Sequence, residues 1–199
     1  PIDFIYLLLL GIIIGIFAEI YSNYVLMMQD FGKKWYRNKF VLKMSICGLI
    51  LGSIYSFLPS SFHNLDELQK VIAEQNTNIE IALLAVIVLF ITTGLAAASG
   101  APGGLFYPML TLGGAIGLIM GNWVEIATGH APSTYIFAGM GAFVAGCSRT
   151  PITAMFLAFA LTKDLLIMKP VLICCITSFL VARLFNEQSI YERQIQIEI

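Results

Sequence analysis

The sequence predicts an all-α polytopic membrane protein with broken and half-length helices. Hydrophobic residues make up 58% of the 199 residues, charged residues make up only 12%, and the mean hydropathy is +0.85. A soluble chain of this length cannot enclose so much apolar surface, so the composition favours a bilayer. The apolar residues also form blocks of helix length, and a glycine- and proline-rich segment separates two of them.

The first half of the chain contains three blocks that fit transmembrane helices. Phe4–Met28 is long enough to span a bilayer, Val41–Leu58 is a shorter second span, and Ile79–Ala98 is the third. Pro59–Thr77 is polar, but its apolar residues recur at helical spacing and predict a short surface helix: Leu65, Leu68, Val71 and Ile72.

The second half begins with a long span and then changes to shorter elements. Phe106–Ile126 carries small residues that favour close helix contact, at Gly113, Gly114, Gly117 and Gly121. Thr134–Gly146 and Pro151–Thr162 are each too short for a hydrocarbon core about 30 Å thick, so they predict a re-entrant or kinked pair. Met168–Phe185 is a last full span, and the tail after it is polar and amphipathic.

Basic residues predict the orientation. They cluster between the first two spans, at Lys33, Lys34, Arg37, Lys39 and Lys43. The positive-inside rule places this loop in the cytoplasm, so the first span runs from outside to inside. The chain opens with Pro1 and has no signal peptide, so we expect further spans upstream.

The interruption at Ser99–Leu110 is the strongest candidate for a functional site. Irregular backbone at membrane depth is tolerated only where it is buried or lines a cavity. A helix that restarts there directs unpaired N–H groups and the positive end of its dipole into the gap, which favours an anion. Leu105, Phe106 and Tyr107 would supply those amides. The alternative is a simple hinge between two packed helices.

Three other residues have two interpretations each. Tyr191 could donate a hydrogen bond to an anion, or it could belong to the interfacial aromatic belt. Arg149 could raise the potential of an anion entrance, or it could snorkel to the headgroups or cap a helix. Glu19 could relay protons, or it could lie at a wet protein interface.

Other functional classes find little support in the sequence. No catalytic set and no metal-binding motif occurs, so we expect neither catalytic residues nor a metal site, and the chain is not predicted to be an enzyme. The net charge of −1 and the lack of a basic stripe predict no nucleic-acid partner. The four cysteines lie in apolar segments and are expected to be buried free thiols.

Four motifs in this order resemble the CLC family of chloride channels and chloride/proton antiporters. Gly104–Pro108 fits the family's Gly-x-Phe-x-Pro signature, and Tyr191 matches its central tyrosine. The full set comprises Ser99–Pro108, Ala138–Ala142, Ser148–Thr153 and Ser189–Tyr191.

The resemblance implies that the chain is the second inverted repeat of such a protein. Residues 1–185 would form the transmembrane repeat and residues 186–199 the helix that bears the tyrosine, with no regulatory domain after it, as in prokaryotic members. The transported ligand would be chloride, without a cofactor. It would bind at Gly104, Leu105, Phe106, Tyr107, Pro108 and Tyr191.

The same resemblance implies the partners and the location. The first repeat would lie upstream in the same protein, and a homodimer would form through Pro151–Thr162 and Met168–Phe185. The protein would sit in a prokaryotic inner membrane with its C-terminus in the cytoplasm. Two alternatives stay open: a half-size subunit that needs a separately encoded first repeat, and a fragment with an assembly role only.

Overall fold

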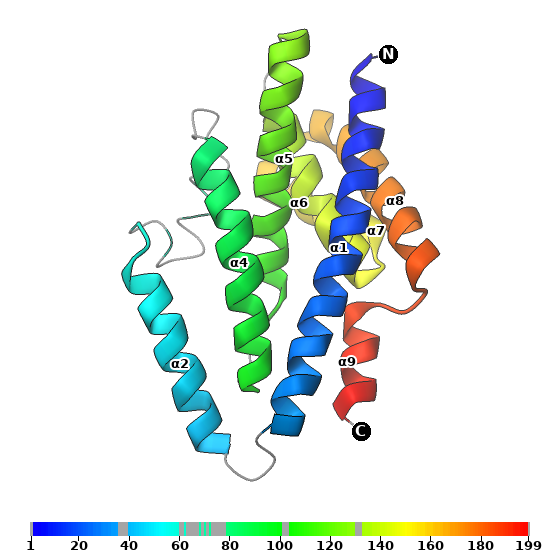
Figure 1. Cartoon of the computed structure of the whole chain (residues 1–199). Helices are drawn as coiled ribbons and strands as arrows, with labels where there is room; N and C mark the ends of the chain where they lie inside the picture. Colours follow the sequence, from blue (N-terminus) through cyan, green and yellow to red (C-terminus); the bar gives the residue numbers. More distant parts are fainter. Residues whose placement is uncertain are drawn as a thin grey trace.

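The computed structural model describes residues 2–35, 40–59, 62, 68, 70, 72, 79–100, 104–129 and 133–198. In these ranges the regular structure is entirely helical, and Figure 1 shows how the helices are arranged. They are α1 (Ile2–Trp35), α2 (Phe40–Ser56), α4 (Ile79–Ser99), α5 (Phe106–Thr128), α6 (Ser133–Ser148), α7 (Pro151–Thr162), a 3-10 turn (Leu165–Ile167), α8 (Met168–Phe185) and α9 (Ile190–Glu198).

The helices follow the predicted spans closely, with one clear extension. α7 and α8 have the predicted bounds, whereas α1 continues past Met28 to Trp35. Hydropathy detects only the apolar part of a helix, and the added turns are polar, with Lys34 donating to Asp30 at 2.6 Å one turn earlier. The predicted surface helix falls mostly outside the described residues, but Leu68 and Ile72 are both buried.

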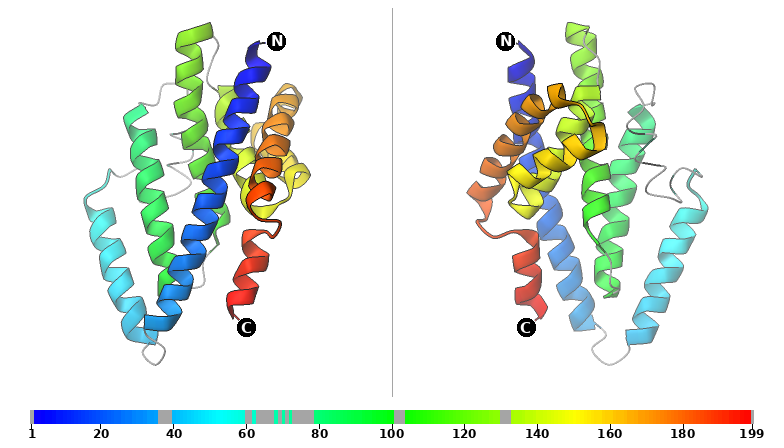
Figure 2. Two further views of the ribbon diagram at one scale, coloured as in Figure 1. Left: turned by 45° about the vertical axis from the view of Figure 1, so that its right-hand side comes forward. Right: turned by 180° about the vertical axis from the view of Figure 1, so that it is seen from behind.

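α6 lies at the centre of the bundle and packs against α1, α5, α7 and α8. The right view of Figure 2, seen from behind, shows the short helices α6 and α7 in front of α1 and α5. The contact between α5 and α6 depends on glycine, because a Cβ on Gly113 or Gly139 would overlap the carbonyl oxygen of the other residue. A Cβ on Gly117 would likewise overlap the Tyr135 carbonyl. The small residues predicted on α5 therefore permit a close approach of two backbones.

Four segments are long and apolar enough to cross a membrane: Phe4–Lys34, Ile79–Ser99, Phe106–Ala127 and Leu165–Gln196. The last of these combines the 3-10 turn, α8 and α9. α2, α6 and α7 are apolar but shorter. The two half-length helices α6 and α7 are joined through Arg149, whose φ of 62° is left-handed and ends α6. They form the broken pair that the sequence predicts.

Candidate functional site

The interruption between α4 and α5 leaves the start of α5 without a side-chain cap. α4 ends at Ser99, Gly100 takes a φ of 73°, and α5 begins at Phe106. The N-cap residue is Leu105, which has no side-chain acceptor, and no side-chain cap hydrogen bond forms there. Most helix starts are capped by Ser, Thr, Asp or Asn. Within the described residues, the first amides of α5 therefore have no side-chain acceptor, and these amides and the helix dipole would favour an anion.

The predicted anion-site residues of this segment differ in burial. Gly104 is exposed, Leu105 and Phe106 are half-buried, Tyr107 is 49% exposed and Pro108 is buried. The Phe106 and Tyr107 rings meet edge to face, with centroids 6.2 Å apart. Phe106 and Leu105 also pack against the core, which fixes the backbone at the start of the helix. Three residues of the motif, 101–103, lie outside the described residues.

Tyr191 is the second residue of α9, and a capping box fixes the start of that helix. The Glu192 carboxylate accepts from the Ser189 backbone N–H at 2.6 Å, and the Glu192 N–H donates to the Ser189 hydroxyl at 3.2 Å. The side chain of Tyr191 is 41% exposed, and its hydroxyl makes no hydrogen bond within the described part of the chain. It lies close enough to the Cys147 thiol and the Tyr21 hydroxyl to interact with them electrostatically.

The two candidate elements start at a similar level of the bundle. Figures 1 and 2 show that α5 and α9 both begin near mid-height, on either side of α1. No hydrogen bond or ring contact joins Tyr191 to the start of α5 within the described residues. The structure therefore brings the two parts of the predicted site to one depth but does not link them directly.

A buried ionic cluster lies beside Tyr191. The Glu19 carboxylate on α1 accepts from Arg149 Nη2 at 2.6 Å and from Arg193 Nη1 on α9 at 3.0 Å. The side chains are only 6%, 8% and 10% exposed, respectively. Arg193 Nη1 also donates to Asn23 Oδ1 at 2.7 Å. Two guanidinium groups thus share one carboxylate, which leaves the cluster with one excess positive charge.

Arg149 caps helix ends, which is one of the roles that the sequence predicts for it. Its guanidinium donates to the Gly146 carbonyl at the end of α6, and to the carbonyls of Ala182 at 3.2 Å and Asn186 at 3.0 Å at the end of α8. Glu19 is buried inside the bundle, where it pairs with both arginines.

Sequence reasoning missed Arg193 and Asn23. Two signals were present in the chain. The Ser189-x-x-Glu192 spacing is that of a capping box and predicts a helix start immediately before Tyr191. An ionisable residue inside a span, here Glu19, calls for a partner of opposite charge, and Arg193 is the basic residue of the amphipathic tail.

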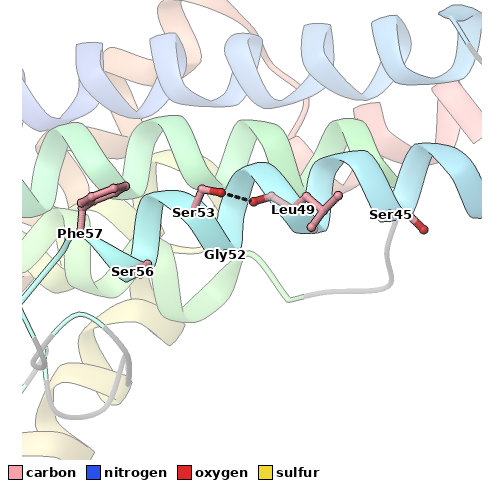
Figure 3. Close-up of a pocket in the computed structure, with 7 residues that line it drawn as sticks. Ser45, Leu49, Gly52, Ser53, Ser56 and Phe57 are labelled. Atoms are coloured by element: carbon pink, nitrogen blue, oxygen red, sulfur yellow. Dashed lines mark hydrogen bonds between the residues drawn. The ribbon is translucent and has the colours of Figure 1, made fainter.

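A groove along α2 lies apart from these residues. It is an open groove of about 770 Å³, and Figure 3 shows its lining of serine, glycine, leucine and phenylalanine residues, with Ser53 donating to the Leu49 carbonyl at 2.8 Å. α2 lies on the side of the bundle away from α9 (Figure 1). Its lining residues are Ser45, Gly48, Leu49, Gly52, Ser53, Ser56 and Phe57. In the part of the chain that the structure describes, no cluster of three His, Cys, Asp or Glu side chains could hold a metal ion.

Comparison with known proteins places this geometry in a family. Residues 1–183 match the family model of the voltage gated chloride channels. The chain is 31% identical over 192 residues to the H(+)/Cl(-) exchange transporter ClcA of Vibrio parahaemolyticus, covering 94% of this chain and 41% of that protein. It is 32% identical over 193 residues to the ClcA of Vibrio cholerae, with the same coverage. The chain thus spans about two fifths of the length of these relatives.

Solved structures agree on the fold. A slow cyanobacterial Cl-/H+ antiporter matches the whole chain with a TM-score of 0.84 at 24% identity, over 47% of its own length. A eukaryotic CLC transporter also matches the whole chain, with a TM-score of 0.81 at 20% identity, over 36% of its length. The family match, the membrane-length apolar helices and the shared fold lead to one conclusion: this chain is an integral membrane protein that belongs to the CLC family of voltage gated chloride channels.

Proposed function

We propose that the chain forms part of a chloride path across the membrane, in a CLC-type channel or chloride/proton antiporter. The observation that carries the proposal is the uncapped start of α5, which follows a break between two helices that are each long and apolar enough to cross a membrane. Irregular backbone between such helices must be buried or line a cavity if it lies within the bilayer. The relatives named as H(+)/Cl(-) exchange transporters support the ion and the class of protein.

In this proposal, the chloride ion sheds water in exchange for fixed donors. The amides of Leu105, Phe106 and Tyr107 and the hydroxyl of Tyr191 hold the ion, and the dipole at the start of α5 lowers its energy. Gly104 and Pro108 shape the backbone around it. None of these donors carries a full charge, so binding stays modest and the ion can leave, as conduction requires.

The proposed assembly is a homodimer in a prokaryotic inner membrane, with the C-terminus in the cytoplasm. The faces predicted for the dimer contact expose large apolar side chains, including Ile152 and Phe156 on α7 and Leu180 on α8, which are 63%, 54% and 54% exposed. Such faces need either lipid or protein against them. The first repeat would come from the part of the relatives that this chain does not cover, and it would supply the residues that decide between channel and antiporter.

A second candidate is a half-size subunit, or a fragment with an assembly role only, that transports nothing without a separate first repeat. This alternative predicts that the 199-residue chain gives no flux when it is reconstituted by itself.

The test is chloride efflux from liposomes, with proton movement recorded in the same experiment. Efflux through the protein that falls to the background of empty liposomes in a Gly104→Val/Tyr191→Ala double variant would support the anion path. Efflux that the double variant leaves unchanged would contradict it. A silent 199-residue chain that gains flux when the missing repeat is co-expressed would identify a half transporter.

A further inference from the structure

α9 is too short to hold its own conformation, so contacts must fix the direction of Tyr191. The helix has nine residues, and isolated helices of this length are not stable in water. It follows a non-helical linker that ends at Ser189. The capping box sets where the helix begins, but it does not attach the helix to the bundle, because both of its partners belong to the same turn.

Among the described residues, three side chains of α9 stand out for their contacts with the rest of the protein. Ile190 is fully buried in the core. Gln194 donates to Gln29 on α1 at a distance of 3.3 Å in a partly exposed position. Arg193 makes the strongest of the three, because its buried guanidinium bonds to both oxygens of Glu19, at 3.0 and 3.4 Å, and to Asn23 at 2.7 Å.

The anchor for Arg193 is set independently of α9. Arg149 holds Glu19 at 2.6 Å and is itself fixed by carbonyls at the ends of α6 and α8. Arg149 also has a φ of 62°, a left-handed conformation that a non-glycine residue adopts at a cost. Glycine would adopt this backbone conformation more easily. We therefore attribute the arginine at this position to its side chain, which holds Glu19 between the two arginines.

We propose that Arg193 is a positioning residue for Tyr191: by bonding to Glu19 and Asn23 on α1, it fixes the rotation of α9 and thereby the direction of the tyrosine hydroxyl in the anion path. The two residues are two positions apart on one helical turn, so a helix clamped at Arg193 cannot turn Tyr191 freely. This inference rests on the proposed ligand role of Tyr191.

The test uses the full-length natural protein in detergent and four variants: Arg193→Met, Tyr191→Phe, the double variant of these two, and Arg193→Lys. Arg193→Met leaves Glu19 paired with Arg149, so no uncompensated carboxylate is created and the protein should still fold. Lys34→Met is the matched control, because it also removes one cation from an ion pair of α1, but from an exposed one. The measurements are chloride affinity by titration calorimetry and hydrogen–deuterium exchange of residues 190–198.

We expect Arg193→Met to raise the exchange of α9 about tenfold and to weaken chloride binding about fivefold, the value of one hydrogen bond. Arg193→Lys should restore part of both, because it keeps the charge but loses the fork geometry. The double variant should bind chloride no more weakly than Tyr191→Phe alone, because a hydroxyl that points away from the ion and a hydroxyl that is absent both fail to donate to it. Lys34→Met should match the wild type.

Four results would overturn the proposal. Unchanged exchange of α9 in Arg193→Met would mean that the clamp does not hold the helix. If the losses of chloride affinity in the two single variants multiply in the double variant, Arg193 acts on the anion by its charge and not through Tyr191. Wild-type chloride affinity in Arg193→Met, next to weakened affinity in Tyr191→Phe, would remove the positioning role and leave the proposed function intact. If Tyr191→Phe itself binds chloride normally, the ligand role fails first and the positioning role fails with it.

Discussion

A side chain added at Gly113 or Gly117 on α5 would overlap the backbone of α6, whereas one added at Gly48 or Gly52 on α2 would meet no atom within 4 Å. Both pairs have the same Gly-x-x-x-Gly spacing, which permits two helices to approach closely. In α5 the facing helix belongs to this chain. In α2 the same spacing lines an open groove (Figure 3). A small-residue motif thus predicts a close contact, but it does not identify the partner.

The largest loss of stability should come from a substitution on α5, where the glycines pack against α6. Gly117→Leu forces a side chain into the Tyr135 carbonyl, and neither backbone can withdraw without moving the centre of the bundle. We expect a loss of about 3 kcal/mol or more in stability, and little folded protein. Thermal unfolding of the full-length protein in detergent measures it. A wild-type melting temperature would show that α5 and α6 pack less closely than described.

The start of α5 offers a glycine that combines open space with a proposed function. A Cβ on Gly104 would meet no atom within 4 Å among the described residues, so Gly104→Val should leave stability within about 0.5 kcal/mol of the wild type. Chloride flux through liposomes should nevertheless fall strongly, because the branched side chain blocks the approach of the ion to the amides. Gly48→Val is the control for the assay, because a Cβ on Gly48 of α2 also meets no atom within 4 Å. Wild-type flux in Gly104→Val would contradict the anion site at α5.

Tyr191 should give a smaller and more specific effect. Its hydroxyl makes no hydrogen bond within the described chain, so Tyr191→Phe removes only an unoccupied donor and should not disturb the fold. Chloride affinity should fall about fivefold, since a single hydrogen bond is worth about 1 kcal/mol. Titration calorimetry measures the affinity, and size-exclusion chromatography checks that assembly is intact. Unchanged chloride affinity would contradict the ligand role and favour the alternative, in which Tyr191 is an interfacial residue of the aromatic belt.

The smallest effect should come from α2. Gly52→Leu points into the open groove, so contacts within this chain predict a change in stability of no more than about 0.5 kcal/mol. Thermal unfolding of the full-length protein, next to Gly117→Leu, measures the contrast directly. A loss above about 1 kcal/mol would mean that another segment or a second copy occupies this face.

The ionic cluster shows where sequence reasoning stopped. Glu19 and Arg149 were both recognisable as polar residues that needed an explanation, and the interface and capping roles were among their predicted alternatives. Their pairing was not predictable, because they lie 130 positions apart and share no motif. Arg193, 174 positions from Glu19, had the weakest signal, since a basic residue in a polar tail normally faces solvent.

The sequence alone determined the fold class, the order and length of the apolar helices, and the break before α5. It could do so because each of these depends on local composition, on the period of hydrophobic residues and on Gly and Pro, which act within a few positions. The predicted bounds of α7 and α8 agree with the structure for this reason, and the extension of α1 to Trp35 was missed because those turns are not apolar.

Only the tertiary structure decided which surfaces meet. It placed the glycines of α5 against α6 and left those of α2 open, brought the starts of α5 and α9 to one depth, and joined Glu19 to both arginines. These outcomes depend on contacts between residues far apart in the chain, where shape and charge across an interface decide the result. No short segment of the sequence specifies these contacts, because each one depends on how all of the helices pack together.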